Sequence, residues 1–403
     1  MSDKYKVKRV LIFVLVVLNV CMIGVLGAYV VPAFRAEQVV LDDENEMHLE
    51  DDLDRVEEVL KDSEFSFVGV GDHFIYPSVF AKQVRPYNFD LMYENTNTYT
   101  QGADLAFVNC STLTLGDTYN MYDYSLLNGP TELMDGLIGA GFDWVSVSSE
   151  HVLDYGVEGL QAQLQFMKDS YSNLSVTGAH QLKGESPVVR EVNGIRVGLA
   201  SYMMDVHLQE DQSWMLDVID LDVLRSDMAA LNTVSDVQFV ALHWGTEFDS
   251  SVEAGQKEIV KCLNECGVEV ILGSHPHVLK PVEMFHGPEQ DTLVYYSLGN
   301  FMSVQNHPSL VVGGMASFDL KYDFDSEVSS FKNVKLIPTF SFASKDLKSF
   351  STNTILDVTK EMEEDQWQQT ISGKACTKEF MNSFVKDIME EYKDENIEVV
   401  YSE

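Results

Sequence analysis

The chain carries few basic residues for its length. Of its 403 residues, 27 are lysine or arginine and 64 are aspartate or glutamate, which gives a formal net charge of −37 at pH 7. Proteins that bind nucleic acid neutralise phosphates with lysine and arginine, and they show a basic surface or stripe. The charge balance therefore argues against direct binding to nucleic acid.

Cysteine is scarce and poorly distributed for a disulfide framework. The chain has five cysteines, of which Cys21 lies in an apolar run and Cys262 and Cys266 are four residues apart. An odd number argues against obligatory pairing, and a lone C-x-x-x-C is more often two core residues than a metal clip. No internal repeat or long low-complexity segment is present. With 45% hydrophobic residues, we expect a large core, in two or three domains or in one large α/β domain with extensions.

The amino-terminal region combines a basic tail with a long apolar run. Residues 1–9 contain four lysine or arginine residues, and residues 10–31 are apolar apart from Asn19. About 22 residues at ~1.5 Å each cross a hydrocarbon layer of ~30 Å. The basic flank predicts a cytoplasmic amino terminus and a single-pass anchor in the cell membrane, with the main domain outside. A cleaved signal peptide is the alternative, although the run is long and residues 26–28 make a poor cleavage site.

Five regions follow from these features. We predict a cytoplasmic tail at 1–9, an anchor at 10–31, an acidic stalk at 32–64, a main domain at 65–345 and an acidic extension at 346–403.

Six apolar segments of the main domain end abruptly in polar residues, and we interpret them as strands. Predicted helices at 157–167, 221–231 and 253–267 lie between several of them. Strands that alternate with helices predict a mainly parallel sheet. The predicted strands end at Asp72, Ser111, His151, His243, His277 and Asn300.

Two later patterns differ. Asn193-Gly194 between apolar runs predicts a hairpin. Alternating segments at 311–324 and 330–342 have no helix between them, so we expect a second, antiparallel layer packed on the first. A further helix is expected at 377–392.

Three histidines follow two of the most apolar strands. His243 ends one strand, and His275 and His277 come directly after the other. Ligands bind at the carboxyl ends of strands in open α/β sheets, and imidazole is a favoured ligand for zinc, iron or manganese sites. The pattern therefore predicts a metal site at this edge of the sheet.

These motifs together resemble the CapA family of bacterial poly-γ-glutamate capsule proteins, a branch of the calcineurin-like metallophosphoesterases. The resemblance covers roughly residues 65–342. It is carried by Gly71-Asp72, Ala103-Asp104 to Asn109, EHVLDYG from Glu150, HWG from His243, Gln256, GSHPHVLKPVE from Gly273 and SLGNF from Ser297. It implies an α/β fold, a four-layer αββα metallophosphoesterase-like sandwich.

The resemblance also implies roles for individual residues. It places metal ligands at Asp72, Glu150, His243, His275 and His277, and a histidine near the leaving group at His151. The remaining site-lining positions are Asn109, Ser111, Asp154 and Asn300. Asp154 is expected to orient a histidine rather than react. Asn300 is either a helix or turn cap or a substrate contact. Asp72, which follows a glycine, is either a metal ligand or only a turn-forming residue.

Three departures from the family pattern limit the expected metal content. Phe74 replaces a ligand histidine, and the adjacent His73 points to the other face if the strand continues. Ser111 replaces a bridging carboxylate, and Glu150 stands where an asparagine is expected. We therefore expect one divalent ion, zinc, manganese or iron, held by Glu150 and two histidines.

Two functions remain open. One is a membrane-anchored accessory protein of capsular polymer synthesis or export, working with a membrane synthase or export complex. The other is an extracellular metal-dependent hydrolase of a phosphoester or amide, with His151 as proton donor. A chain of charge −37 repels a polyanionic polymer unless cations or a basic cleft intervene.

Overall fold

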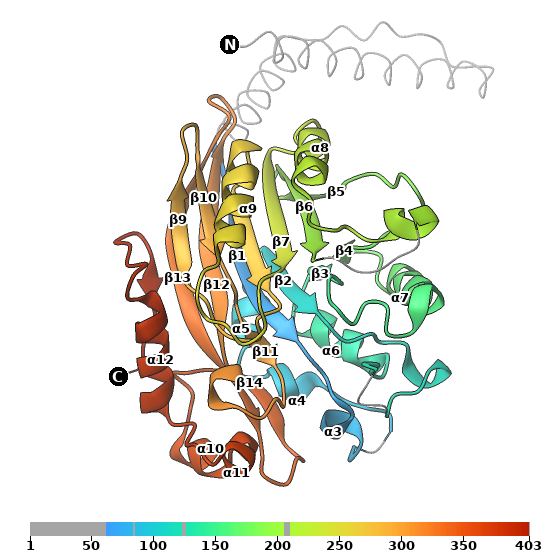
Figure 1. Ribbon diagram of the computed structural model, residues 1–403, viewed down its shortest axis with the longest axis vertical. Helices are drawn as coiled ribbons and strands as arrows, with labels where there is room; N and C mark the ends of the chain where they lie inside the picture. Colours follow the sequence, from blue (N-terminus) through green and yellow to red (C-terminus); the bar gives the residue numbers. More distant parts are fainter. Residues whose placement is uncertain (1–61, 84, 123–125, 205–209, 403) are drawn as a thin grey trace, which may run out of the picture. The chain divides into compact units, whose positions relative to one another are not determined.

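The computed structural model describes residues 62–83, 85–122, 126–204 and 210–402 (Figure 1). The chain divides into two units, and the larger one comprises residues 63–322 and 329–403. In the smaller unit, residues 323–328 form a turn in which Asp323 accepts hydrogen bonds from the backbone N–H groups of Asp325 and Ser326. The predicted anchor at 10–31 lies outside the described residues. Within the described ranges, no helix combines the length and apolar character needed to span a bilayer.

The first sheet has β1 at its centre and the order β14-β13-β12-β1-β2-β3-β4. The strands β1, β2, β3 and β4 run parallel, whereas β13 and β14 are antiparallel. Two short strands, β11 and β15, pair in parallel with β1 and β13. The strands are β1 (Asp62–His73), β2 (Leu105–Cys110), β3 (Trp144–Ser146), β4 (Ser175–Thr177), β11 (Asn300–Met302), β12 (Val312–Asp323), β13 (Val328–Ala343), β14 (Phe350–Thr354) and β15 (Glu398–Val399).

The second sheet has the order β5-β6-β7-β8-β10-β9. Its four middle strands run parallel, and an antiparallel strand closes each edge. The predicted hairpin is confirmed, because Asn193 and Gly194 adopt φ of 50° and 83° between β5 and β6. The strands are β5 (Val188–Val192), β6 (Ile195–Met203), β7 (Val237–His243), β8 (Val270–Ser274), β9 (Val282–His286) and β10 (Asp291–Tyr295).

The prediction of one parallel sheet with a separate antiparallel layer was wrong. The first three predicted strands, up to residue 151, belong to the first sheet, and the other three lie mainly in the second. The strands after residue 311 extend the first sheet beside β1 instead of forming another layer. Hydrophobic periodicity identifies a buried strand, but it does not say which distant strand it pairs with.

The two sheets pack face to face through aromatic side chains. The Phe67 ring of β1 stacks on Phe318 of β12 with centroids 4.8 Å apart. The same ring meets Phe239 of β7 edge-on at 5.3 Å, and all three side chains are buried. Because Phe239 belongs to the second sheet, these contacts join the inner faces of the sheets.

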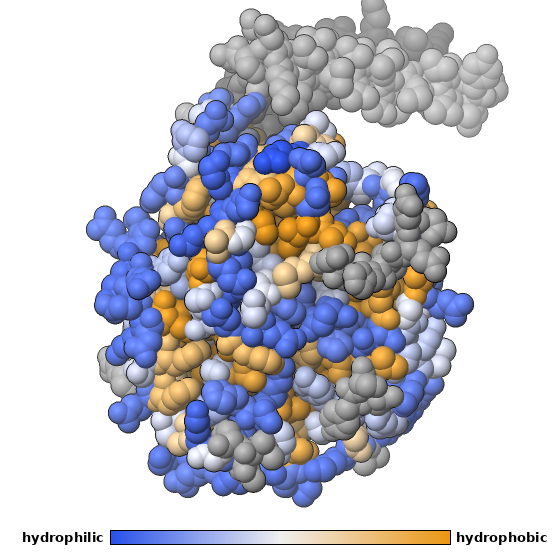
Figure 2. All heavy atoms as spheres, in the orientation of Figure 1, coloured by the Kyte–Doolittle hydropathy of each residue, from blue (hydrophilic) through white to orange (hydrophobic). Residues whose placement is uncertain are grey.

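Helices cover the outer face of each sheet. The helices α6 (Glu132–Gly139) and α7 (Gly156–Ser170) bury leucines against β1 and β2 of the first sheet. The helices α8 (Leu221–Leu231) and α9 (Ala254–Glu265) do the same against β7 and β8 of the second. The order of layers is therefore helix, sheet, sheet and helix. Figure 2 shows hydrophilic residues along the margin of the viewed face and an apolar area between α8 and α9.

The predicted helices at 157–167, 221–231, 253–267 and 377–392 are confirmed as α7, α8, α9 and α12. Local signals explain the boundaries. Asp220 caps α8 by accepting from the N–H groups of Asp222 and Val223, and Gly267 at φ 89° follows the end of α9. The remaining helices are α3 (Pro77–Phe80), α4 (Asp90–Tyr93), α5 (Asn97–Thr100), α10 (Lys360–Asp365), α11 (Trp367–Ser372) and α12 (Lys378–Met389), with 3-10 turns η1 (Gly116–Thr118), η2 (Glu210–Met215) and η3 (Pro308–Leu310).

Glu269, the residue before β8, is a buried carboxylic acid whose effect on folding stability can be measured. It is 5% exposed and accepts a hydrogen bond from the Gln238 N–H at 2.6 Å, and burial raises the pKa of its carboxyl to about 8. The folded state therefore keeps a proton that the unfolded state releases from about pH 4.3 upward, so folding stability falls as pH rises to about 8.

We expect Glu269→Gln to remove this loss and to raise the free energy of unfolding at pH 8 by about 1–3 kcal/mol, with a smaller effect at pH 4. Urea titrations at both pH values measure it. The exposed Glu258→Gln on α9 serves as the control, for which no pH-dependent gain is expected. An equal gain at both pH values for Glu269→Gln contradicts the assignment.

Candidate metal centre

The carboxyl ends of strands from both sheets meet at the candidate site. Asp72 of β1 lies beside Asn109 of β2 in the sheet register, and His243 ends β7 beside Ser274 of β8. Gly71 has no room for a side chain, because a Cβ there would lie 2.0 Å from the Gly299 carbonyl oxygen. Close approach of these strands therefore requires glycine before Asp72.

Glu150, His243 and His275 place three ligand atoms around one point. Glu150 Oε2 lies 2.5 Å from His243 Nε2 and 3.5 Å from His275 Nδ1, and the two ring nitrogens are 3.1 Å apart. Ligand atoms bound ~2.0–2.1 Å from a tetrahedral ion lie about 3.3 Å from one another. Two of the three separations are close to that value, and the chemistry of two imidazoles and a carboxylate suits a divalent metal.

The ring of His243 is oriented by neighbours on its other side. Its Nδ1 lies 3.0 Å from the Ser274 hydroxyl and 3.3 Å from the Asn109 amide nitrogen. These contacts leave Nε2 directed at Glu150, as expected for a ligand held by surrounding polar groups. The sequence-predicted Asn109 therefore supports the site without joining the ligand group.

Asp72 lies behind the ligand group and is absent from both candidate sets of ligand atoms among the described residues. Its Oδ1 accepts from Asn109 Nδ2 at 2.9 Å and from the Ser111 hydroxyl at 3.1 Å, and its Oδ2 accepts from the His275 N–H at 2.9 Å. Burial opposes ionisation, but the hydrogen bond and charge of His277 outweigh it and hold the pKa of Asp72 below its usual value.

The backbone of the two ligand-loop histidines is unusual. His275 has φ of 91° and His277 has φ of 58°, in the region that side chains other than glycine rarely adopt. The hydrogen bond from the His275 N–H to Asp72 stabilises this conformation. Such strain clusters at functional sites.

His277 is held from two sides. Its Nδ1 lies 3.1 Å from Asn300 Oδ1 and 3.6 Å from Asp72 Oδ2, and its Nε2 lies 3.7 Å from Glu150 Oε1. Burial lowers its pKa, but the two carboxylates outweigh burial and raise the pKa to about 10. The buried Asn300 contacts His277 through Oδ1, and its Nδ2 donates to Gln305 and to the carbonyl of Leu310, the last residue of η3.

Glu247 is the site residue that the sequence reasoning missed. It forms a second group of ligand atoms with Glu150 and His277, all within 4.8 Å of one another. The two oxygens of Glu150 serve different groups, because Oε2 faces His243 and Oε1 faces His277. The available signal was its place four residues after His243, in the loop that leaves the same strand end.

His151 lies on the turn that carries Glu150. Its Nδ1 is 2.8 Å from Asp154 Oδ2 and its Nε2 is 3.7 Å from Glu150 Oε1, while a quarter of its side chain, 24%, is exposed. The edge-to-face ring of Phe74 lies 5.3 Å away. Asp154 thus contacts the ring as expected, and both residues come from the turn after β3, which ends at Ser146 instead of continuing to Glu150.

His73 and Phe74 point to opposite faces, as the alternation of side chains along a strand predicts. His73 is buried on the other face, where its Nε2 lies 2.7 Å from the Tyr93 hydroxyl and burial lowers its pKa to about 3. The Phe74 ring instead packs edge-on against His277 at 4.7 Å. An apolar ring therefore occupies the position where the family pattern expects a ligand.

The raised pKa of His277 is testable in the metal-free protein by histidine-selective NMR titration. We expect a pKa of about 10, so the stabilisation that His277 contributes is complete below about pH 6.5 and is lost as pH rises through about 10. Asp72→Asn removes one carboxylate and is expected to lower this pKa by about one pH unit or more. Asp154→Asn, which alters a carboxylate at His151, is the control. A His277 pKa near 6.5 in the unaltered chain rules out this charge arrangement.

Comparison with known proteins agrees with the motifs. The model of the family "Bacterial capsule synthesis protein PGA_cap" matches residues 54–305. The PGA biosynthesis protein CapA of Bacillus subtilis (strain 168) is 27% identical over 189 residues, which is 45% of this chain and 47% of that protein. The Capsule biosynthesis protein CapA of Bacillus anthracis is 24% identical over 231 residues, 54% of this chain and 55% of that protein. The chain spans about half the length of these curated relatives.

Similar solved structures are more distant. A phosphatase from Mycoplasma pneumoniae has a TM-score of 0.45 at 12% identity, covering 68% of this chain and 93% of that chain. A 5'-nucleotidase from Candida albicans SC5314 has a TM-score of 0.43 at 13% identity, covering 81% of this chain and 58% of that chain. The family match spans more than half of the sequence and includes both strand-end histidine motifs. The chain therefore belongs to the bacterial capsule synthesis protein PGA_cap family.

Proposed function

We propose that the chain acts in the synthesis or export of a bacterial capsular polymer, with one divalent metal ion at Glu150, His243 and His275. The observation that carries the proposal is the convergence of these three side chains from one turn and two strand ends. Family membership supplies the biological process. The names of the two CapA relatives support poly-γ-glutamate, or a related polymer, as the product.

The cellular arrangement is part of the same proposal. The apolar run at 10–31 anchors the chain in the cell membrane, and the basic residues before it keep the amino terminus in the cytoplasm. The main domain then lies outside the cell, beside a membrane synthase or export complex. A net charge of −37 repels a polyanionic polymer at long range. The proposal therefore assigns direct binding of the polymer to the partner complex.

One ion is proposed because the two groups of ligand atoms differ. In the first group, two buried histidines lie within 3.5 Å of the Glu150 carboxylate. The second group has one histidine, His277, and its other ligands are the exposed carboxylates of Glu150 and Glu247. A second ion would therefore be held by a single imidazole and would have to share Glu150 with the first.

The chain's own residues define what the site does. A divalent ion held by these residues would supply Lewis acidity and would lower the pKa of a bound water. Glu150 and the two histidines hold the ion, and Asp72 fixes the backbone of His275. Asp154 holds Nδ1 of His151, which leaves Nε2 directed toward the site to give or accept a proton.

Metal analysis of the purified full-length chain tests the proposal. We expect one equivalent of zinc, manganese or iron after dialysis. Replacing His243 and His275 together by alanine removes two of three ligands, and is expected to reduce bound metal at least about tenfold. His286→Ala, an exposed histidine at the end of β9, is the matched control. Two equivalents in the unaltered chain, or metal retained in the double variant, contradict the single site.

The same variants can be tested for capsule formation in a capsule-forming host from which the host's own member of this family has been deleted. The unaltered chain and His286→Ala are expected to restore capsule, and the double variant is not. Restoration by the double variant means that a metal-independent scaffold suffices.

A second candidate function is extracellular hydrolysis of a phosphoester or amide, and the position of His151 favours it. Its Nε2 lies 3.7 Å from Glu150 Oε1, so a leaving group near the ligands is within its reach. For this function, His151→Ala is expected to lower turnover of bis(p-nitrophenyl) phosphate or a p-nitroanilide about 10²–10⁴-fold with unchanged metal content. Equal turnover by both proteins excludes His151 as the proton donor.

A further inference from the structure

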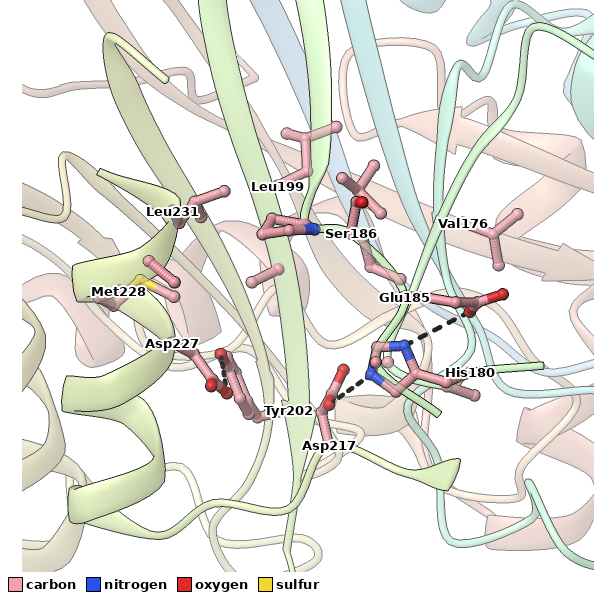
Figure 3. Close-up of a pocket in the computed structure, with 18 of the residues that line it drawn as sticks. Val176, His180, Glu185, Ser186, Leu199, Tyr202, Asp217, Asp227, Met228 and Leu231 are labelled. Carbon is pink, nitrogen blue, oxygen red and sulfur yellow. Dashed lines mark hydrogen bonds and ion pairs between the residues drawn. The ribbon is translucent and has the colours of Figure 1, made fainter. Parts of the chain in front are cut away.

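A second pocket lies apart from the metal centre. Its volume is ≈ 360 Å³, and its lining contains none of the metal-centre residues. Figure 3 shows α8 on one side, β6 behind, and the segment that carries His180 and Glu185 on the other side. Pockets of about 300 Å³ and above take small organic ligands when apolar walls surround a few polar groups.

One end of the pocket gathers carboxylates. The Tyr202 hydroxyl donates to Asp227 Oδ2 at 3.1 Å. Across the pocket, His180 Nε2 lies 2.8 Å from Asp217 Oδ1, and its Nδ1 lies 3.6 Å from Glu185 Oε2. In Figure 3, Tyr202 lies between Asp227 and Asp217. His180 thus contacts two of the three carboxylates, Asp217 and Glu185, whereas Asp227 is hydrogen-bonded to Tyr202.

The positive charge at this end of the pocket does not balance the negative charge of the carboxylates. The hydrogen bond to Asp217 raises the pKa of His180, which provides one cation. Within the described parts of the chain, no lysine or arginine forms an ion pair with Asp217, Asp227 or Glu185. Burial, together with the charge of Asp217, raises the pKa of Asp227. A ligand cation would relieve this repulsion.

The other end of the pocket is apolar. Met228 and Leu231 of α8 line it together with Leu199 of β6 and Val176 of β4. Among the described residues, the groups of ligand atoms close enough to hold a metal ion do not include this carboxylate cluster. The pocket therefore suits an organic cation with an apolar body better than a metal ion.

We propose that this pocket binds a primary amine on an aliphatic chain, with the ammonium group at Asp227 and the chain against Met228 and Leu231. The ammonium supplies the charge that the carboxylates lack, and the chain removes apolar surface from water. A neutral ligand of the same shape gains only the second contribution. The inference rests on this pocket alone and is independent of the metal centre.

Calorimetric titration of the full-length chain with n-hexylamine tests the proposal, in 0.15 M salt to screen its general negative charge. We expect n-hexylamine to bind at least about tenfold more tightly than hexan-1-ol, since only the amine pairs with a carboxylate. Asp227→Asn keeps the shape and removes the charge, so it is expected to weaken n-hexylamine at least about tenfold. Its metal content is expected to equal that of the unaltered chain.

Asp222→Asn is the matched control, because it removes the same charge from α8 at a side chain that is 96% exposed. We expect it to leave n-hexylamine binding unchanged. Equal affinity for the amine and the alcohol, or equal weakening by Asp222→Asn and Asp227→Asn, overturns the proposal.

If Asp227→Asn does not fold, Glu185→Gln on the opposite wall takes its place. A loss of amine affinity of about two- to fivefold supports the site, and unchanged affinity overturns it.

Discussion

The buried carboxylate of Asp72 is the contact on which the metal centre depends, because it joins the ends of the two sheets. It accepts from Asn109 in the first sheet and from the backbone N–H of His275, directly after β8 of the second. Burying a carboxylate is costly unless hydrogen bonds and positive charge compensate, and here both are present. The same contact holds His275 at φ 91°, which aims its ring at the other ligands.

Charge is distributed differently in the metal centre and in the pocket beside Tyr202. At the metal centre, three imidazoles face the carboxylates of Asp72 and Glu150. At the pocket beside Tyr202, one imidazole contacts Asp217 and Glu185, and the third carboxylate, Asp227, accepts from the Tyr202 hydroxyl. The register pairs Tyr202 of β6 with Leu242, one residue before His243, so neighbouring strands serve both sites. Their ligands therefore differ in kind: a divalent ion fits one, and an organic cation fits the other.

Residue type and strand position predicted that the strand-end histidines lie close together, as His243 and His275 do. The family resemblance placed Glu150 with them and His151 nearby, and the structure has Glu150 beside both histidines and His151 in contact with Asp154. Two features could not be predicted. Asp72 lies behind the ligands, because three hydrogen bonds from distant residues occupy its oxygens. Glu247 reaches the site from a loop whose course depends on packing between the sheets, which no local pattern encodes.

By itself, the sequence determined the features that depend on a few neighbouring residues. These include the helices α7, α8, α9 and α12, the hairpin at Asn193-Gly194, and polar residues at the ends of buried strands. Only the tertiary structure decided that β12 and β13 join the sheet of β1 while β6 and β7 belong to another. The reason is physical: periodicity and capping are local interactions, whereas strand pairing and the meeting of side chains are contacts between residues far apart in the chain.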